Sequence, residues 1–342
     1  MYKEISFLRV PLFLVGLLAA TLLSGCANTA DSGGAEAGTD DERRLRIAVI
    51  PKGSTHFFWK SVHAGAAKAA EESNVEIIWQ GPQKEDDRQM QIQVVQNFVS
   101  RGVDGIVLAP LDDRSLVPPV KAAINRNIPV VIFDSDLTYK EYSSFVATNN
   151  FEGGRLCAKR LASIMEGQGK AIMLRYSEGS ASTAERERGF LEGMQEYGPQ
   201  IELISTNQYA WATCEKAFQA SQNLLNRFGE EVTGVFCPNE SSTQGMLRAL
   251  QTSGRAGRVR FVGFDSNETL VKALRDGQIH GLAVQDPFNM GYMGVKTAAA
   301  VIRGQKYVKH IDTGITMVTP DNVDNPQTQE LLNPNLQRWL SE

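Results

Sequence analysis

Several short apolar runs end in side chains that can bond hydroxyl groups. Asp134 and Asp265 directly follow two such runs, and Asn239 and Gln285 stand at the ends of two others. A carboxylate accepts from two neighbouring hydroxyls at once, and an amide both donates and accepts. Aromatic residues follow the first run and a later one, and they would stack on an apolar ring face. This inventory suits a small ligand that carries several hydroxyl groups.

Each of these side chains also has an ordinary structural explanation. Asp265 or Asn239 would serve equally well as the N-cap of a following helix, and Phe58 could belong to the core of the first helix. Residues 182–185 form a capping box, which makes Glu185 a structural residue. A binding site is favoured because such residues end runs in both halves of the chain, and the carboxyl ends of parallel strands meet at one edge of a sheet.

Catalysis and metal binding find little support. No nucleophile-elbow, phosphate-loop or dinucleotide-binding glycine motif follows a predicted strand. The four histidines, His56, His63, His280 and His310, lack metal-ligand spacing and are interpreted as surface or core residues. A pair of aspartates could hydrolyse a glycoside, but a nearby arginine would lower the pKa of the general acid. We therefore expect no catalytic residue, no metal and no cofactor.

The apolar runs alternate with longer amphipathic segments. This alternation predicts strands joined by helices, and hence parallel sheets covered by helices on both faces. Two sets of runs fit two doubly wound α/β domains, with a boundary near Thr148, better than one wide sheet. The predicted strands are 45–50, 75–79, 105–109, 129–133, 171–174, 201–206, 234–237, 260–263 and 281–284; the predicted helices are 57–73, 86–101, 115–126, 182–197, 213–228, 241–252, 267–276 and 288–303.

The first 25 residues predict export. A basic start precedes an uncharged apolar stretch, residues 10–23, which is too short to span a bilayer and suits a secretory signal. Small residues then precede Cys26, as in the bacterial lipobox, in which the cysteine is acylated; an ordinary signal with an incidental cysteine is the alternative. Residues 26–44 are rich in Ala, Gly, Ser, Asp and Glu, so we predict a flexible tether.

The charge of the chain argues against nucleic acid as a partner. The formal net charge is −4, from 35 basic and 39 acidic residues, so no large cationic surface is available to phosphate. Three cysteines remain after Cys26. Cys157 fits a buried helical position, and a bridge between Cys214 and Cys237 stays possible.

Six motifs stand in a particular order along the chain. They are His56-Phe57-Phe58, 129–134 (PVVIFD), 184–190 (AERERGF), 235–240 (VFCPNE), 262–265 (VGFD) and Gln285. In this order they resemble the ribose-, galactose- and xylose-type periplasmic binding proteins of ABC transporters, whose fold also forms the effector domain of lac-repressor-like regulators. The resemblance covers residues 45–319. It implies two doubly wound parallel-sheet domains, a hinge of three crossovers and a ligand cleft between the domains.

The resemblance also implies a role for each site residue. Phe57 and Phe58 would sandwich the ring of a small sugar. Asp134 and Asp265 would accept from paired hydroxyls, and Arg186 would donate a two-pronged hydrogen bond. The full implied set is Thr55, Phe57, Phe58, Asp134, Ser135, Arg186, Trp211, Asn239, Asp265 and Gln285.

The domain boundaries follow from the same resemblance. The chain would cross between the lobes near Thr148, Gln285 and His310. The N-terminal lobe would comprise residues 45–148 and 286–309, the C-terminal lobe residues 149–285 and 310–330, and residues 331–342 would form a tail.

The implied function is capture of a pentose or hexose by hinge closure and its delivery to an ABC permease. The protein would be a monomer in the periplasm or at the cell surface, anchored through lipidated Cys26. Ser135 stands where ribose binders commonly have Arg, and residues 134–136 are closer to rhamnose- and autoinducer-2-type relatives. A ligand sensor that serves a chemoreceptor or sensor kinase stays open, and a glycoside-processing enzyme is the remote alternative.

Overall fold

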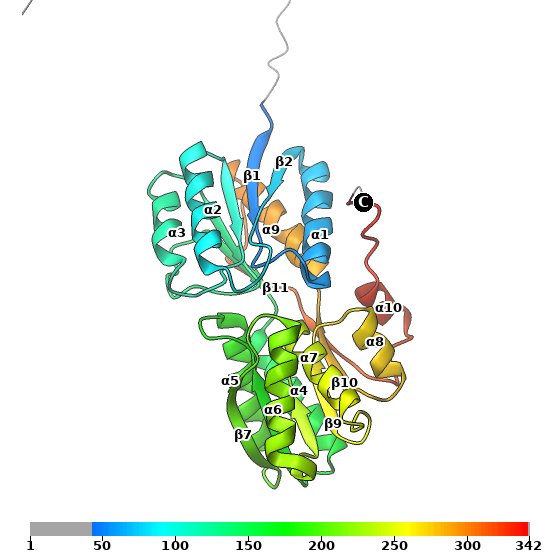
Figure 1. The fold of residues 1–342 in the computed structure, drawn as a ribbon. Helices are drawn as coiled ribbons and strands as arrows, with labels where there is room; N and C mark the ends of the chain where they lie inside the picture. Colours follow the sequence, from blue (N-terminus) through cyan, green and yellow to red (C-terminus); the bar gives the residue numbers. More distant parts are fainter. Residues whose placement is uncertain (1–42, 341–342) are drawn as a thin grey trace, which may run out of the picture. The chain divides into compact units, whose positions relative to one another are not determined.

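Residues 43–340 are described by a computed structural model, in which two α/β lobes each contain a six-stranded sheet (Figure 1). The fold class predicted from the sequence is confirmed. Both lobes lie within a single compact unit of the chain. The predicted signal peptide, Cys26 and nearly all of the predicted tether lie outside the described residues. Among those described, no helix combines the length and apolar character that crossing a membrane requires.

The sheet of the N-terminal lobe is wholly parallel, with the strand order β11-β5-β4-β3-β1-β2. Its central strands are buried on both faces, because alternate residues such as Ile47 and Ala48 enter separate cores beneath different helices. Helices α1 and α9 cover one face, and α2 and α3 cover the other. The elements are β1 (Leu45–Ile50), α1 (Phe57–Ser73), β2 (Val75–Trp79), α2 (Arg88–Arg101), β3 (Gly105–Leu108), α3 (Val117–Ile124), β4 (Val130–Phe133), β5 (Ser144–Ala147), α9 (Pro287–Ile302) and β11 (His310–Asp312).

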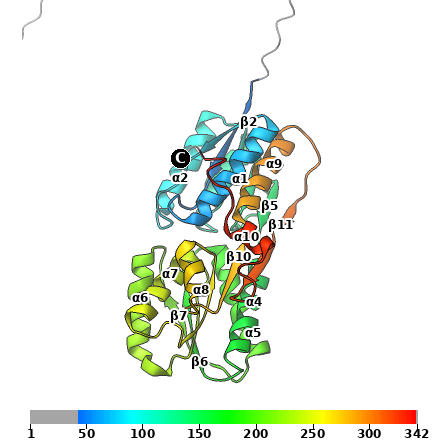
Figure 2. The ribbon, with the colours of Figure 1, turned by 90° about the vertical axis from the view of Figure 1, so that its right-hand side faces the viewer.

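The C-terminal lobe repeats this arrangement with the order β12-β10-β9-β8-β6-β7, in which only the edge strand β12 is antiparallel to its neighbour. Helices α4 and α5 cover one face, and α6, α7, α8 and α10 cover the other (Figure 2). The elements are α4 (Asn150–Ile164), β6 (Lys170–Arg175), α5 (Ala181–Tyr197), β7 (Glu202–Tyr209), α6 (Cys214–Phe228), the 3₁₀ turn η1 (Gly229–Glu231), β8 (Gly234–Phe236), α7 (Glu240–Thr252), β9 (Arg260–Phe264), α8 (Glu268–Arg275), β10 (Gly281–Gln285), β12 (Ile315–Val318) and α10 (Pro326–Leu332).

The chain passes between the two sheets after β5, after β10 and after β11. The third crossing follows Asp312, so the predicted lobe boundary between residues 309 and 310 is three residues too early, because His310 pairs with Phe145 inside the N-terminal sheet. Strand β11 pairs with β5 at the edge of this sheet. One residue beyond β11, the N–H of Thr313 also donates to the carbonyl of Ala147 in β5 (3.1 Å). The predicted start of the tail at residue 331 is also too early, because Leu332 is buried in the core of the C-terminal lobe.

Helices α4 and α5 approach each other closely enough to require glycine. A Cβ atom at Gly154 would clash with the carbonyl of Arg186, and one at Gly189 would clash with the carbonyl of Phe151. The two helix backbones therefore lie in direct contact, which fixes where α5 holds Arg186 relative to the sheet.

The substitution Gly154→Ala should destabilise the protein. The added methyl must push α4 and α5 apart, and overpacking of this kind costs about 1–3 kcal/mol. Chemical denaturation should show that loss of unfolding free energy, whereas the control Lys159→Ala, at an exposed position of the same helix, should stay within about 0.5 kcal/mol of wild type. Equal stability of Gly154→Ala and the control would show that the helices are not in backbone contact.

Candidate ligand-binding site

Two aspartates occupy equivalent positions in the two lobes. Asp134 follows β4 and Asp265 follows β9, and both have a left-handed backbone, with φ of 60° and 66°. Each N–H is held by the neighbouring strand, through the carbonyls of Val146 (3.0 Å) and Ala283 (2.8 Å). A non-glycine residue in this conformation costs about 1–3 kcal/mol and is typical of functional sites.

Both aspartates line one cavity between the lobes. The space in it that is open to the centre of a water molecule is about 30 Å³, which is room for a few waters at most. The lobes are therefore closed tightly around a set of polar side chains. The lining residues are Lys52, His56, Phe58, Trp59, Glu85, Asp134, Tyr176, Ser180, Ser182, Thr183, Arg186, Asn239, Glu240, Asp265 and Gln285.

Arg186 is the buried cation of the C-terminal half. Its Nε donates to Asn150 Oδ1 (2.7 Å) and its Nη1 to the carbonyl of Pro238 (3.0 Å). The guanidinium plane lies over the ring of Phe264, 4.0 Å from its centre, an arrangement that adds a cation–π attraction. These contacts hold the group rigidly and leave Nη2 without a hydrogen-bond partner.

Asp265 is the carboxylate next to Arg186, with 3.8 Å between Oδ2 and Nη1. It accepts from Gln285 Nε2 (2.6 Å) and from the backbone N–H of Glu240 (3.1 Å). Burial raises the pKa of Asp265, and Arg186 and Gln285 oppose that shift. Burial likewise raises the pKa of Glu240.

Lys52 is the buried cation of the N-terminal half. Its Nζ lies 2.8 Å from Asp134 Oδ2 and donates to Ser182 Oγ of the other lobe (3.0 Å). Ser182 N–H in turn donates to Ser135 Oγ (3.0 Å). Lysine and serine thus tie the end of β4 to the first turn of α5.

A second buried ion pair joins His56 and Glu85, with 2.9 Å between Nδ1 and Oε1. Trp59 Nε1 donates to the same carboxylate (2.5 Å), and so does the hydroxyl of Tyr176 from the C-terminal lobe. Burial by itself would lower the pKa of His56, but Glu85 raises it to about 9. Burial by itself would raise the pKa of Glu85, but His56 and Tyr176 lower it to about 2. The pair therefore stays ionised at neutral pH.

The cavity gathers polar atoms that lack partners. In the described part of the chain, six buried side-chain atoms have no hydrogen-bond partner, and four of them belong to residues that line this cavity. Each such atom costs about 1–3 kcal/mol unless a ligand or water bonds it. Three of the four, Ser180 Oγ, Arg186 Nη2 and Gln285 Oε1, have neither a hydrogen bond nor an ion pair, and the fourth, Asp134 Oδ2, lies in the ion pair with Lys52.

The structure brings most of the residues expected from the sequence to this place. Phe58, Asp134, Arg186, Asn239, Asp265 and Gln285 line the cavity, and Phe57 lines a small void beside it. Ser135 is buried and supports the site through Ser182 instead of facing the cavity.

Two expected residues lie elsewhere. Thr55 is exposed, and Trp211 keeps 54% of its surface in solvent. Trp211 has a left-handed backbone (φ 62°), and its N–H donates to the carbonyl of Tyr176 (2.8 Å). This turn directs the indole toward Tyr209, with ring centres 6.4 Å apart, and away from the cavity.

Other lining residues were missed from the sequence. His56, interpreted there as a surface or core residue, faces the cavity. Lys52 and Tyr176 follow β1 and β6, so the rule that sites lie beyond strand ends could have found them. Glu85 lies in a loop and does not directly follow a strand, so this rule could not have found it. The missed set is Lys52, His56, Trp59, Glu85, Tyr176, Ser180, Ser182, Thr183 and Glu240.

The cysteines outside the N-terminal segment are all unbridged. Cys157 and Cys237 are buried, and Cys214 is partly exposed. The bridge between Cys214 and Cys237 that the sequence left possible is absent from the structure.

Two parallel-sheet lobes that close on one polar cavity define a two-lobed solute-binding protein. Residues 47–306 match the family described as periplasmic binding protein domain, and the chain belongs to that family. It is 30% identical to the ribose import binding protein RbsB of Escherichia coli, over 76% of this chain and 86% of that protein. The resemblance noted from the sequence is confirmed.

Two solved structures are similar over most of the chain. A carbohydrate transporter solute-binding protein from Agrobacterium radiobacter, in complex with D-arabinose, has a TM-score of 0.81 and 32% identity, and covers 85% of this chain and 100% of its own. An ABC transporter solute-binding protein from Agrobacterium vitis, with bound D-fucose, has a TM-score of 0.81 and 34% identity, and covers 84% of this chain and 100% of its own.

The ion pair of His56 and Glu85 should make stability depend on pH. A histidine with a folded pKa of about 9 and an ordinary pKa of 6.5 adds stability below pH 6.5 that is lost as the pH rises through 9. Wild type should lose up to about 3 kcal/mol of unfolding free energy between these pH values. Glu85→Gln should lose much less, because the amide cannot hold the imidazolium.

Urea denaturation at pH 6.5 and pH 9 measures this difference. His310→Gln, which removes an exposed histidine from β11, is the control and should lose as much as wild type. An identical loss in Glu85→Gln would mean that the ion pair does not form.

Proposed function

We propose that this protein captures a small neutral sugar, a pentose or a hexose, by closing its two lobes, and delivers it to an ABC permease. The observation that carries the proposal is the set of three polar atoms in one buried cavity, Ser180 Oγ, Arg186 Nη2 and Gln285 Oε1, that have neither a hydrogen bond nor an ion pair. Both donors and acceptors occur among them, which matches hydroxyl groups because each hydroxyl donates and accepts. The solute-binding relatives bind ribose, D-arabinose or D-fucose.

The charges of the cavity favour a neutral ligand. Lys52, His56 and Arg186 are cations, and four carboxyl groups face them. A phosphate or sugar acid would add an anion with no free cation to pair it, which is costly in a buried site.

The proposed roles follow the geometry. Asp134 and Asp265 accept from ligand hydroxyls, Arg186 donates through Nη2, and Phe58 packs on the ring. Asn239 and Gln285 complete the polar shell, and Lys52 joins it as a cation that offsets Asp134. Closure brings these groups together, and the hinge lies at Thr148, at Gln285 and after Asp312.

Direct bonds between the lobes support closure. The N–H of Asp113 donates to the carbonyl of Gly179 (2.9 Å), and the N–H of Phe58 donates to Glu240 Oε2 (3.4 Å). Each joins a residue of the N-terminal lobe to one of the C-terminal lobe. A ligand that bonds both lobes at once would stabilise a closed form in which its hydroxyls replace some of the bonds within the cleft.

The same proposal places the protein outside the cytoplasm. Its family is periplasmic, and residues 1–25 resemble a lipoprotein signal. Acylation of Cys26 would tether a monomer to the membrane, close to its permease.

A panel of D-ribose, D-arabinose, D-fucose and D-glucose 6-phosphate tests the ligand class. At about 100 times its Kd, a bound sugar adds about 2.7 kcal/mol to the unfolding free energy, so the melting temperature should rise with at least one neutral sugar. Titration calorimetry should then show a single site. Binding of the phosphate ester alone, or of no monosaccharide in a wider panel, would overturn the proposal.

Arg186→Ala should weaken binding of that sugar by at least 30-fold. The change removes a buried charged donor, and such losses cost about 2–5 kcal/mol. Arg188→Ala is a matched control, because Arg188 lies on the same helix and pairs with the exposed Glu185 and Glu192. Calorimetry should find control and wild-type affinities equal. Unchanged affinity in Arg186→Ala would remove this residue from the site.

A further inference from the structure

The chain continues beyond the part that matches the family, which ends at residue 306. After β12 it forms α10, which packs on the C-terminal lobe. Leu332 and Val323 are buried in the same core as α7 and α8, and Asp324 pairs with Arg275 of α8 (2.8 Å). Helix α10 is therefore anchored firmly to this lobe.

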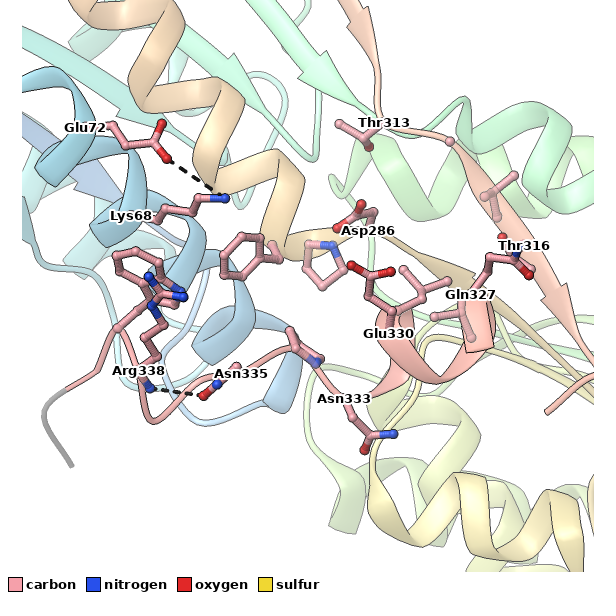
Figure 3. A pocket seen from close by; sticks show the side chains of 18 residues that line it. Lys68, Glu72, Asp286, Thr313, Thr316, Gln327, Glu330, Asn333, Asn335 and Arg338 are labelled. Carbon is pink, nitrogen blue, oxygen red and sulfur yellow. Dashed lines mark hydrogen bonds and ion pairs between the residues drawn. The ribbon is translucent and has the colours of Figure 1, made fainter. Parts of the chain in front are cut away.

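Residues 333–340, here named the C-terminal strap, then leave the C-terminal lobe. Five of them line a cavity of about 880 Å³ together with Lys68 and Glu72 of α1 and Phe288 of α9, and both helices belong to the N-terminal lobe. Figure 3 shows Arg338 and Asn335 of the strap on the side of Lys68, with Glu330 of α10 across the cavity. In Figures 1 and 2 the described chain ends beside the N-terminal lobe.

The strap has a defined local structure. The N–H of Arg338 donates to Asn335 Oδ1 (3.2 Å), and the N–H groups of Trp339 and Leu340 both donate to the carbonyl of Leu336 (3.0 and 2.9 Å). The guanidinium of Arg338 lies 4.8 Å from the ring centre of Trp339. Leu340 is only 8% exposed. The segment is thus a folded turn with a buried apolar end.

The strap lies beside a part of α1 that is distant from the hinge. Asp286, Thr313 and Gly314, at two of the crossings, line the same cavity. Lys68 lies 11 residues beyond the start of α1, which is about 16 Å along the helix at 1.5 Å per residue. A rotation of the lobes about their crossings moves this part of α1 relative to α10. The strap must then stretch or detach.

We infer that the C-terminal strap is a fourth link between the lobes, one that favours the closed form before any ligand binds. The inference rests on the hinge closure of the proposed function. It has a consequence for affinity, because the apparent Kd of a ligand equals its intrinsic Kd divided by the closed fraction. Loss of the strap lowers that fraction and weakens binding.

Amide hydrogen exchange of the ligand-free protein tests the strap without any sugar. The N–H of Asp113 bonds Gly179, and the N–H of Ser182 bonds Ser135, so both amides are protected only while the lobes are closed. The N–H of Ile106, bonded to Pro129 within one sheet (3.0 Å), is the internal reference. The variants are Trp339→Ala and a chain that stops after Asn333, which keeps α10.

Exchange at Asp113 and Ser182 should accelerate by about 3- to 10-fold in both variants, while exchange at Ile106 stays the same. Gln337→Ala, an exposed strap position that does not line the cavity, should match wild type. Unchanged exchange at the two interlobe amides would overturn the inference. Equal acceleration at Ile106 would also overturn it, because the strap would then support overall stability alone.

The exchange assay contains no sugar, so its result tests the strap alone. The proposed function is tested by the sugar panel, and either proposal can be overturned without the other. If the sugar panel finds a ligand, its apparent Kd should rise by the ratio of the closed fractions before and after the change, and the exchange rates give those fractions. A Kd that falls when the strap is removed would contradict the coupling between strap and closure.

Discussion

Charged groups withdrawn from water must find partners, and this constraint shapes the whole cleft. Asp134 is paired by Lys52, Asp265 lies beside Arg186, and Glu85 is paired by His56. No pair joins neighbours in sequence, so each depends on a completed lobe. An isolated buried charge would cost several kcal/mol. A few donors and acceptors in the cavity have no partner in these pairs, and a ligand must bond to these atoms.

The scaffold meets this constraint by placing strand ends together. Parallel strands in each lobe end at one edge, and the two edges face each other. The left-handed backbones of Asp134 and Asp265 turn both carboxylates into the shared space. Backbone contact between α4 and α5, at Gly154 and Gly189, holds the guanidinium of Arg186 beneath Asp265. Rigid helices thus support an arrangement that the strand ends alone could not hold.

Closure is a property of the interface between the lobes. Lys52, Glu85 and Phe58 of one lobe bond Ser182, Tyr176 and Glu240 of the other. These bonds lie in the cleft, whereas the strap bridges the lobes along α1. Contacts on two sides of the hinge explain how so little space remains in the cavity. A ligand must compete with the cleft bonds as it enters, so selection depends on how well its hydroxyls replace them.

The amino-acid sequence alone determined the alternating strands and helices, the two-lobe fold and six of the residues that line the cavity. The strands and helices depend on local periodicity, and five of the residues follow strand ends, whereas Arg186, within α5, was expected only from the resemblance to the family. The short strands β5, β11 and β12 were missed, because three or four residues carry little pattern, and β11 pairs with β5 across more than 150 residues of sequence.

Only the tertiary structure decided the rest of the site. Lys52 and Tyr176 follow strands, as Asp134 does, but their type did not suggest a role until their partners across the cleft were in place. Glu85 enters from a loop whose path depends on packing. Trp211 was expected in the site and is turned outward by a left-handed backbone, since direction depends on dihedral angles that tertiary hydrogen bonds select. The strap, too, acquires a function only because folding brings the end of the chain beside α1.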